Sequence, residues 1–512
     1  MTVPLRWLDD APPARLPAGV TWGSPLPRGA ASTPNVLRLR RRGDGAAVPA
    51  QFWPLATWPD GSLKWVGAAL GATEQPEEYD IHIDPDAAAR TAPQSVAAQI
   101  LEGAVTVDTG VIRVRFGERG GSALVQSIAR GGVTVAEDVH LVSLLQDRVD
   151  DDGASGPRAH FRSAVSEVHL EQDGPIRAVV RVDGHHRDAA GSREWLPFTV
   201  RFVLAAGSDR IRIVHSFIWD GDAEVDFIAG LGVRAAVPLR AEPHDRHVRV
   251  AGADGGVFAE AVRGLTGLRR DPGAEVRQAQ VAGRRTPPPA EWAHEVSSRL
   301  HLIPTWGDVT LTQLSADGFG IRKRTAPGHA WIDAGAGTRS EGFVSLSDPD
   351  GGVGLGVRSF WQSHPGQLDV RDATSDRATV TAWLHSPEAR PMDMRFYHDG
   401  LGQDDFASQL DALEITYEDY EPGFGDAHGI ARTHELVLVA YGATPSAAEF
   451  AHDVTHLQRP PLMQPTPAHL ASVGVFGDWA LVDRSTPVRA EIEDSLDFLL
   501  EFYLGQVEQR SW

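Results

Sequence analysis

Alternating apolar and polar positions dominate the middle of the chain. From Val105 to about Ala440, short segments such as VTVDTGVIRVRFG and SDRIRIVHSFIWDGD repeat this period-two pattern, with turn residues between them. Successive side chains on a strand point to opposite faces, so the pattern predicts antiparallel strands with few helices. We therefore expect a very large antiparallel β-sandwich, a supersandwich, over residues 96–442.

The first part of the chain predicts a smaller β domain, residues 1–95. Short apolar runs alternate there with Pro and Gly. The most distinctive stretch is WPLATWPDGSLKW, from Trp53 to Trp65, in which Pro59, Asp60 and Gly61 form a turn signal between two strands. The fold class is thus mainly β from the beginning of the chain.

Near Pro445 the apolar period changes to that of a helix. Ser446 to Gln458 is predicted to be helical with Ser446 as its cap, and a second helix is predicted from Pro487 to Gln509. The second helix has an apolar stripe, yet the sequence after it supplies almost no apolar partner. We expect residues 443–512 to be a linker and the first helices of a truncated α/α domain, covered by a further helical domain or, in a homo-oligomer, by a partner subunit. The stripe consists of Ile492, Leu496, Leu499, Leu500, Tyr503 and Val507.

Composition narrows the classes of partner. The chain has 512 residues, 42% of them hydrophobic and 23% charged, and a formal net charge of −21. This balance disfavours a nucleic-acid partner, and no apolar run approaches the roughly 20 residues of a membrane helix. The N-terminus lacks the pattern of a secretory signal, so we expect a cytoplasmic protein, or a secreted one that has been trimmed.

Cysteine and lysine usage narrow the chemistry. No cysteine is present, which excludes disulfides, thiolate metal sites and a cysteine nucleophile. HExxH, GxSxG and Walker patterns are absent too, and we expect no metal and no cofactor. Lys64 and Lys323 are the only lysines among 48 basic Lys and Arg residues. Lys323 lies between Arg322 and Arg324, and these cationic neighbours would lower its pKa toward that of a base.

Residues 351–400 concentrate aromatic and titratable groups. A strand is predicted from Gly352 to Trp361, which would place Trp361 and Ser363 on one face and His364 on the other. A second predicted strand, Ala378 to His385, likewise ends in an aromatic residue and a histidine, Trp383 and His385.

The same region then places a carboxylate, a guanidinium and a phenol in alternation. Asp393, Arg395 and Tyr397 would share one strand face. Each residue alone is best explained as part of an ordinary solvated face, whereas the cluster is equally compatible with a site.

These residue types suit an anionic sugar. β-Elimination from a uronate requires a cation to neutralise the carboxylate, a base for the C5 proton and an acid for the leaving oxygen. We expect Arg322, Arg395 or Arg432 to bind the carboxylate, Lys323 or His364 to be the base, and Tyr397 or His385 to be the acid. Further substrate-binding candidates are Arg358, Trp361, Trp383 and His434.

Two other classes of function remain open. The sandwich could bind carbohydrate without catalysis. A glycoside hydrolase would need two opposed carboxylates such as Glu388 and Asp393. These two residues lie close together on one segment, so this class of function ranks last.

Several stretches, in order along the chain, resemble one family. They are TWGSPLPRG, WPLATWPDGSLKW, the region from GPIRAVVRVDGHH to SDRIRIVHSFIWDGD, GFGIRKRT, FWQSHP, WLHSPEARPMDMR, GIARTHE and GVFGDWALVDRSTP. Together they are similar to the exo-type rhamnogalacturonan lyases, polysaccharide lyase family 26 and its YetA-like relatives. The resemblance implies an N-terminal β domain, a central β-sandwich and a C-terminal α/α toroid, with metal-independent β-elimination on the pectin backbone. It also implies that family members continue well beyond VEQRSW, the last residues of this chain.

Overall fold

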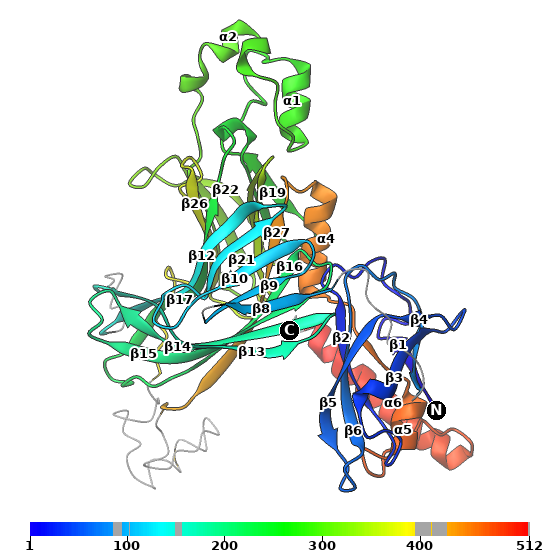
Figure 1. The fold of residues 1–512 in the computed structure, drawn as a ribbon. Helices are drawn as coiled ribbons and strands as arrows, with labels where there is room; N and C mark the ends of the chain where they lie inside the picture. Colours follow the sequence, from blue (N-terminus) through cyan, green and yellow to red (C-terminus); the bar gives the residue numbers. More distant parts are fainter. Residues whose placement is uncertain (85–94, 102, 149–155, 395–410, 412–426, 510–512) are drawn as a thin grey trace.

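The computed structural model describes residues 1–84, 95–101, 103–148, 156–394, 411 and 427–509, and it is mainly β (Figure 1). An N-terminal β domain, a central β-sandwich and a short C-terminal helical region follow one another along the chain. The predicted fold class is confirmed.

The N-terminal domain packs two antiparallel sheets, β28-β1-β7-β3-β4 and β2-β6-β5, around one apolar core. The predicted hairpin of residues 53–65 is present, because Gly61 has the positive φ of 83° that its turn requires and Asp60 accepts the backbone N–H of Ser62. The elements are β1 (Thr2–Trp7), β2 (Val20–Pro25), the 3-10 helix η1 (Pro34–Val36), β3 (Leu37–Arg41), β4 (Ala47–Val48), β5 (Ala50–Thr57), β6 (Leu63–Leu70) and β7 (Tyr79–Ile83).

The central domain consists of two layers that meet where β12 pairs with β13. One layer has the order β22-β21-β20-β25-β26-β17-β12, and β11, β10, β9 and β8 extend from β12. The other has the order β13-β14-β15-β16-β27-β24-β23-β18-β19. All pairings are antiparallel, as the alternating pattern predicts.

The strands of this domain are as follows, in chain order. They are β8 (Ala97–Leu101), β9 (Ala104–Asp108), β10 (Ile112–Phe116), β11 (Val125–Arg130), β12 (Val133–Gln146), β13 (Ala159–Asp173), β14 (Arg177–Asp188), β15 (Glu194–Ala205), β16 (Arg210–Ile218), β17 (Phe227–Pro238), β18 (His247–Ala251), β19 (Val257–Ala261), β20 (Asp308–Ser315), β21 (Gly318–Arg324), β22 (Ile332–Gly337), β23 (Phe343–Asp348), β24 (Gly351–Val357), β25 (Gly366–Arg371), β26 (Arg377–His385) and β27 (Ala431–Tyr441).

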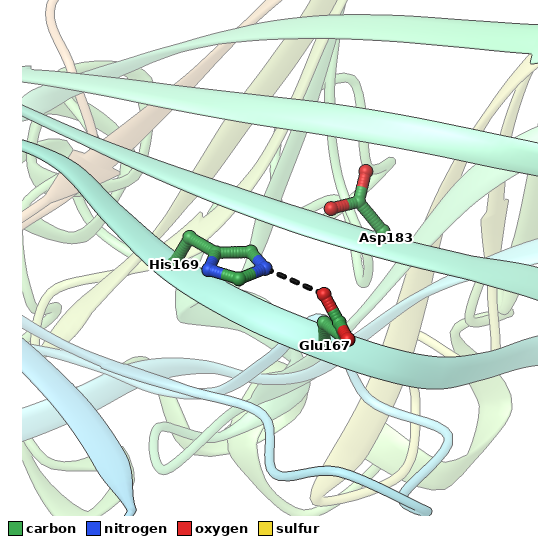
Figure 2. A group of neighbouring side chains, drawn as sticks. All are labelled: Glu167, His169 and Asp183. Carbon is green, nitrogen blue, oxygen red and sulfur yellow. Dashed lines mark hydrogen bonds and ion pairs between the residues drawn. The ribbon is translucent and has the colours of Figure 1, made fainter.

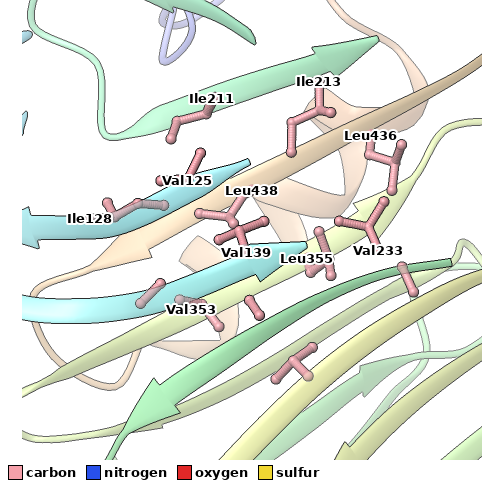
Figure 3. Close-up of a cluster of buried hydrophobic side chains, with 14 of the residues drawn as sticks. Val125, Ile128, Val139, Ile211, Ile213, Val233, Val353, Leu355, Leu436 and Leu438 are labelled. Carbon is pink, nitrogen blue, oxygen red and sulfur yellow. The ribbon is translucent and has the colours of Figure 1, made fainter. Parts of the chain in front are cut away.

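The main core lies between the two layers. Val139 and Val233 from one layer belong to the same buried cluster as Ile213, Leu355 and Leu436 from the other (Figure 3). Each such side chain contributes about 1.5–3 kcal/mol when it is fully buried. The core thus fixes which face of every strand is turned outward.

An excursion between β19 and β20 carries short helices at one end of the sandwich (Figure 1). Val276 and Trp292 are buried in its small separate core. Its helices are α1 (Ala274–Val281), η3 (Pro289–Glu291), α2 (His294–Ser297) and η4 (Leu300–Leu302); a further 3-10 helix, η2 (Pro243–Asp245), precedes β18.

The C-terminal region returns to both domains. Helix α4 (Ala447–Gln458) begins with the predicted Ser446 cap, which forms a capping box with Glu449, and buries Phe450 against β23 and β27. β28 (Met463–Pro465) then joins the N-terminal sheet beside β1, and α5 (Pro467–Val473) follows it.

The predicted last helix is confirmed as α6 (Pro487–Gln509). Much of its apolar stripe is exposed, with Ile492 at 56% and Tyr503 at 70%. None of the described helices combines the length and apolar character that a membrane crossing requires.

One predicted strand is shorter than expected. β24 ends at Val357, and residues 358–363 form turns, so the prediction that the strand reaches Trp361 was wrong. Ser359 has a positive φ of 54°, which strand geometry does not allow. Trp361, Ser363 and His364 therefore do not occupy alternating strand faces.

Candidate functional site

Six polar residues form one straight row across six neighbouring strands. In register order they are Arg322 on β21, Thr310 on β20, Asp369 on β25, Thr381 on β26, Arg234 on β17 and His140 on β12. With about 4.8 Å between strands, the row extends for roughly 24 Å. We call this surface the polar face.

The polar face is turned away from the sandwich core. The residues on either side of Asp369, Leu368 and Val370, belong to the core, and so do Val233 and Ala235 on either side of Arg234. Because side chains alternate along a strand, the row must point outward from the same layer. Polar positions that alternate with core positions thus build a continuous hydrophilic surface.

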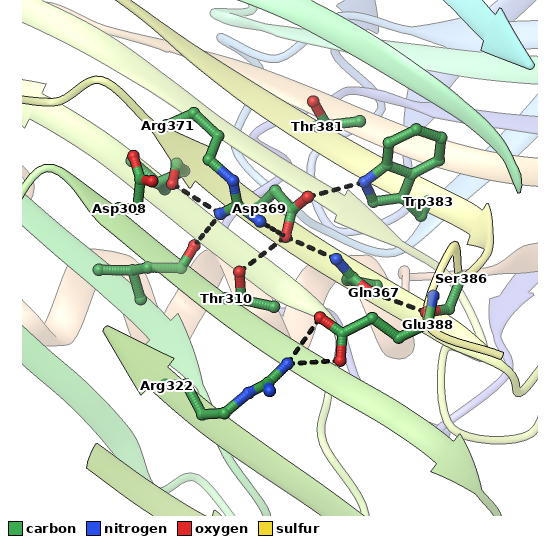
Figure 4. Close-up of polar contacts among 12 residues, drawn as sticks. Asp308, Thr310, Arg322, Gln367, Asp369, Arg371, Thr381, Trp383, Ser386 and Glu388 are labelled. Carbon is green, nitrogen blue, oxygen red and sulfur yellow. Dashed lines mark hydrogen bonds and ion pairs between the residues drawn. The ribbon is translucent and has the colours of Figure 1, made fainter. Parts of the chain in front are cut away.

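Buried Asp369 organises the centre of the polar face (Figure 4). Its carboxylate accepts hydrogen bonds from Thr310 Oγ1 (3.0 Å), Gln367 Nε2 (2.9 Å) and Trp383 Nε1 (2.8 Å), and it forms an ion pair with Arg371 at 2.9 Å. The bond to Nε1 holds the Trp383 indole in a defined orientation. Asp369 therefore acts as a rigid support for the aromatic ring.

Arg234 is the cation of the polar face with the fewest protein partners. Its Nε donates to Thr381 Oγ1 (2.9 Å), and its guanidinium lies 5.7 Å from the centre of the Trp383 ring. Among the described residues, no carboxylate lies within ion-pair distance of Arg234. Burial lowers the pKa of this guanidinium, but an arginine side chain stays protonated in proteins. Its charge is thus available to an anionic ligand.

His140 lies directly opposite Arg234 and is 5% exposed. Its Nδ1 is 2.7 Å from the backbone oxygen of Asp138, which can only accept, so Nδ1 carries the proton. Burial lowers the pKa of His140, and the charges of Arg162 and Arg234 lower it further. A neutral imidazole results, with the lone pair on Nε2, and no hydrogen bond to Nε2 occurs within the described part of the chain.

A hollow of about 490 Å³ connects these groups. His140, Arg234 and Trp383 line it together with Arg162 and Arg377. Arg162 is neutralised by Asp138 at 2.8 Å, and Arg377 pairs with Glu137 at 2.8 Å. The hollow therefore combines an aromatic ring, one unpaired guanidinium and one neutral imidazole.

Of the residues predicted from sequence, Arg322 and Trp383 lie on the polar face. Arg322 is at the far end of the row, where Nη2 donates to both oxygens of Glu388 and the guanidinium lies 5.5 Å from the Trp331 ring. His385, also on β26, is 5% exposed, and its Nε2 is 3.0 Å from the backbone oxygen of Arg390. Burial lowers the pKa of His385.

Lys323 lies on the opposite face from Arg322, since the two residues are adjacent on β21. Its Nζ donates to both oxygens of Glu260, each at 2.6 Å, and lies 4.0 Å from the centre of the Trp306 ring. The structure does not bring Lys323 to the hollow.

The remaining predicted residues are dispersed. Trp361 stacks with Arg339 at 4.3 Å, and His364 follows it in the turn after β24. Arg432 and His434 lie on β27 in the other layer. His434 stacks on His215 with ring centres 5.7 Å apart, and burial followed by the charge of Arg432 lowers its pKa to about 3.

Arg358 lies at a junction between domains, where its Nη1 is 3.4 Å from Glu435 Oε2. Arg395 and Tyr397 fall outside the described residues.

Sequence reasoning missed Arg234, His140 and Asp369. Arg234 is the only charged residue in β17, FIAGLGVRAAVP, and Asp369 similarly interrupts the apolar part of β25. A charge is rarely buried without a partner or a function. For Arg234, one charged residue within an otherwise apolar strand was the signal that could have identified the position.

A separate group of side chains has the composition of a metal site (Figure 2). Glu167, His169 and Asp183 each place one ligand atom within 4.8 Å of the others, on β13 and β14. However, Asp183 already accepts hydrogen bonds from Thr199 Oγ1 (2.7 Å) and Arg181 Nε (2.8 Å). His169 Nε2 also lies 2.7 Å from Glu167 Oε2, so all three residues have partners within the protein.

Three family models match the chain in order. The PcRGLX-like N-terminal RIFT barrel domain matches residues 1–84, the central beta sandwich domain residues 96–455, and the C-terminal alpha/alpha toroid domain residues 460–512. The uncharacterized protein YetA of Bacillus subtilis (strain 168) is 30% identical over 519 residues, which cover 99% of this chain and 57% of YetA. The chain thus spans less than two thirds of that relative.

Solved structures resemble the chain more distantly. An alpha-mannosidase from Enterococcus faecalis V583 has a TM-score of 0.48 at 10% identity, covering 91% of this chain and 46% of its own. A galactose mutarotase-like protein from Lactobacillus casei ATCC 334 has a TM-score of 0.30 at 10% identity, covering 66% of this chain and 100% of its own. Both resemblances are too distant to assign an activity.

Proposed function

Because this chain belongs to the PcRGLX-like family, the YetA-like rhamnogalacturonan lyase family that its sequence motifs predicted, we propose that it is a polysaccharide lyase-like enzyme. Its proposed substrate is rhamnogalacturonan or a related uronate oligosaccharide. The observation that carries the proposal is the direct pairing of Arg234 with His140 in the hollow of the polar face.

The first requirement of β-elimination is a cation for the uronate carboxylate. Arg234 presents a guanidinium without a carboxylate partner, beside the Trp383 ring on which a sugar can stack. Neutralising the carboxylate lowers the pKa of the C5 proton, and the partly buried setting strengthens this effect.

The second requirement is a base. His140 Nε2 accepts the C5 proton; the electron pair of the C5–H bond then forms the C4–C5 double bond, and the C4–O bond breaks. The leaving oxygen keeps the electrons of that bond and takes a proton from an acid. His160, which also lines the hollow, and Tyr397 are candidates for this acid.

The activity is tested by incubating the protein with rhamnogalacturonan and homogalacturonan oligosaccharides. A rise in the ultraviolet absorbance of a 4,5-unsaturated uronate is expected, and the rise should be roughly 10- to 100-fold slower in Arg234→Gln. If no substrate produces the absorbance, the lyase proposal is wrong. Sugar binding without turnover would instead favour the carbohydrate-binding alternative.

A further inference from the structure

A second hollow, of about 250 Å³, lies where the three parts of the chain meet. Its walls come from residues 18–21 of the N-terminal domain, from strands of the sandwich and from α4 with residues 460–462. We call it the junction hollow. It is separate from the polar face, since none of the residues that line one hollow also lines the other.

The junction hollow carries more positive than negative charge. Arg212 and Arg358 share the single carboxylate of Glu435: Arg212 Nε and Nη2 donate at 2.7 Å and 3.1 Å, whereas Arg358 Nη1 is 3.4 Å away. Two guanidiniums with one carboxylate leave one charge uncompensated. Arg358 has the longer contact and a side chain that is 35% exposed, so it is the group best placed to bind an added anion.

Arg210 adds a third guanidinium to the same wall. Its side chain is only 10% exposed and pairs with Asp209 at 2.6 Å and with Asp453. Its buried Nε has no hydrogen-bond partner among the described residues. A buried donor without a partner is unfavourable, and a bound acceptor would satisfy it.

Neighbouring groups do not remove this positive charge. His456 is buried in the same wall, and burial followed by the charge of Arg210 lowers its pKa to about 3, so it is neutral at pH 7. Arg177 lies near Arg212 and stacks on Trp53 at 5.1 Å. Burial and the charge of Arg212 lower the pKa of Arg177 to about 10, so this guanidinium is still protonated.

We propose that the junction hollow binds a small oxyanion, a carboxylate or a phosphate, between Arg212 and Arg358. The planar guanidinium fork matches both anions, and the volume exceeds what either group alone needs. Since the walls come from all three parts of the chain, a bound anion would also hold these parts together. The inference does not depend on lyase activity.

The test is isothermal titration calorimetry with galacturonate, galactose and inorganic phosphate, at constant ionic strength set with chloride. Galactose has the size of galacturonate without its charge. We expect galacturonate, phosphate or both to bind, and galactose not to bind. Arg358→Gln should weaken binding by at least about tenfold, because a charge-assisted hydrogen bond is lost. The bound anion should also raise the melting temperature of the wild-type protein.

Two control variants separate the possible sites. Arg113→Gln changes an exposed arginine that is paired with Asp108 and lines neither hollow, and this variant should bind as the wild type does. Arg234→Gln removes the cation of the polar face and should also leave junction binding intact. Binding to galacturonate alone would identify a carboxylate ligand, and binding to phosphate alone a phosphate ligand.

Three results would overturn the proposal. The first is absence of binding by both anions at millimolar concentration. The second is equal affinity in the wild type and Arg358→Gln. The third is a result in which Arg234→Gln loses all anion binding while Arg358→Gln keeps it. That result would place the ligand on the polar face.

Discussion

Arg234 and His140 occupy directly opposed positions on β17 and β12, with their side chains on the outer face of the same layer. The arginine has no carboxylate partner among the described residues, and the imidazole is held by a backbone carbonyl. A cation and a neutral base are therefore adjacent in one hollow. The proposed elimination requires this combination.

Replacing Arg234 tests the carboxylate contact. Arg234→Gln should lower kcat/KM by roughly 10- to 100-fold, since one charge-assisted interaction contributes about 1.5–3 kcal/mol. Arg234→Lys keeps the charge without the fork and should be intermediate. Steady-state kinetics on a uronate oligosaccharide measure both effects, with Arg113→Gln as the control. Unchanged kinetics in Arg234→Gln would exclude it from the site.

His140→Gln tests the base. It should lower kcat by about 10²- to 10⁴-fold with a smaller effect on KM, because proton transfer is lost while sugar contacts remain. The pKa of His140 is lowered from 6.5, so the neutral base persists as pH falls and the acidic limb of kcat should lie below pH 6.5. A pH–rate profile provides the measurement. If the acidic limb is unchanged in His140→Gln, the limb reports the titration of another group.

Lys323→Met separates a structural from a catalytic role. The variant should reduce the free energy of unfolding by about 1–2 kcal/mol, because it leaves the partly buried Glu260 unpaired. Its kcat should stay near that of the wild type, since Lys323 lies on the face opposite Arg322. Urea unfolding and kinetics measure the two effects, and Glu260→Gln in the same background should recover part of the stability. Loss of turnover in a stable Lys323→Met protein would restore Lys323 as the base.

Acid should destabilise the fold through its buried histidines. Burial lowers the pKa of His434 to about 3 and that of His186 to about 4, both from 6.5. Between pH 6.5 and the lowered pKa values, the unfolded chain binds more protons than the folded one. The free energy of unfolding is therefore highest above pH 6.5 and decreases as the pH falls.

His434→Phe isolates one of these protons. The phenyl ring can occupy the same stack beside His215 and Phe217. Between pH 7 and pH 5, the wild type should lose about 2 kcal/mol more stability than the variant. Urea titrations at both pH values test this, and equal losses would show that His434 is not a buried neutral group.

The layered β architecture could be predicted from local pattern. Alternation in segments such as β16, RIRIVHSFI, reports directly which residues face a core, and Ser446 with Glu449 marks the start of α4. The end of β24 could not be predicted this way. Phe360 and Trp361 continue the pattern, yet Phe360 is buried in the core from a turn.

The candidate site depended on strand order. Arg322 and His140 are far apart in the sequence and belong to one row only because β21, β20, β25, β26, β17 and β12 are neighbours in that order. The flanking arginines predict Lys323 as a candidate base, but adjacency on a strand places it on the face opposite Arg322.

The sequence by itself determined the fold class, the family and the presence of cations and histidines suited to a uronate. These depend on local alternation, composition and motifs, which a single chain displays. Only the tertiary structure decided that Arg234 lies opposite His140. It also decided that Arg358, a predicted substrate-binding residue, lies at the junction hollow and not on the polar face. Long-range strand pairing sets such neighbours, because hydrogen bonding between distant segments and burial of the shared core select the register.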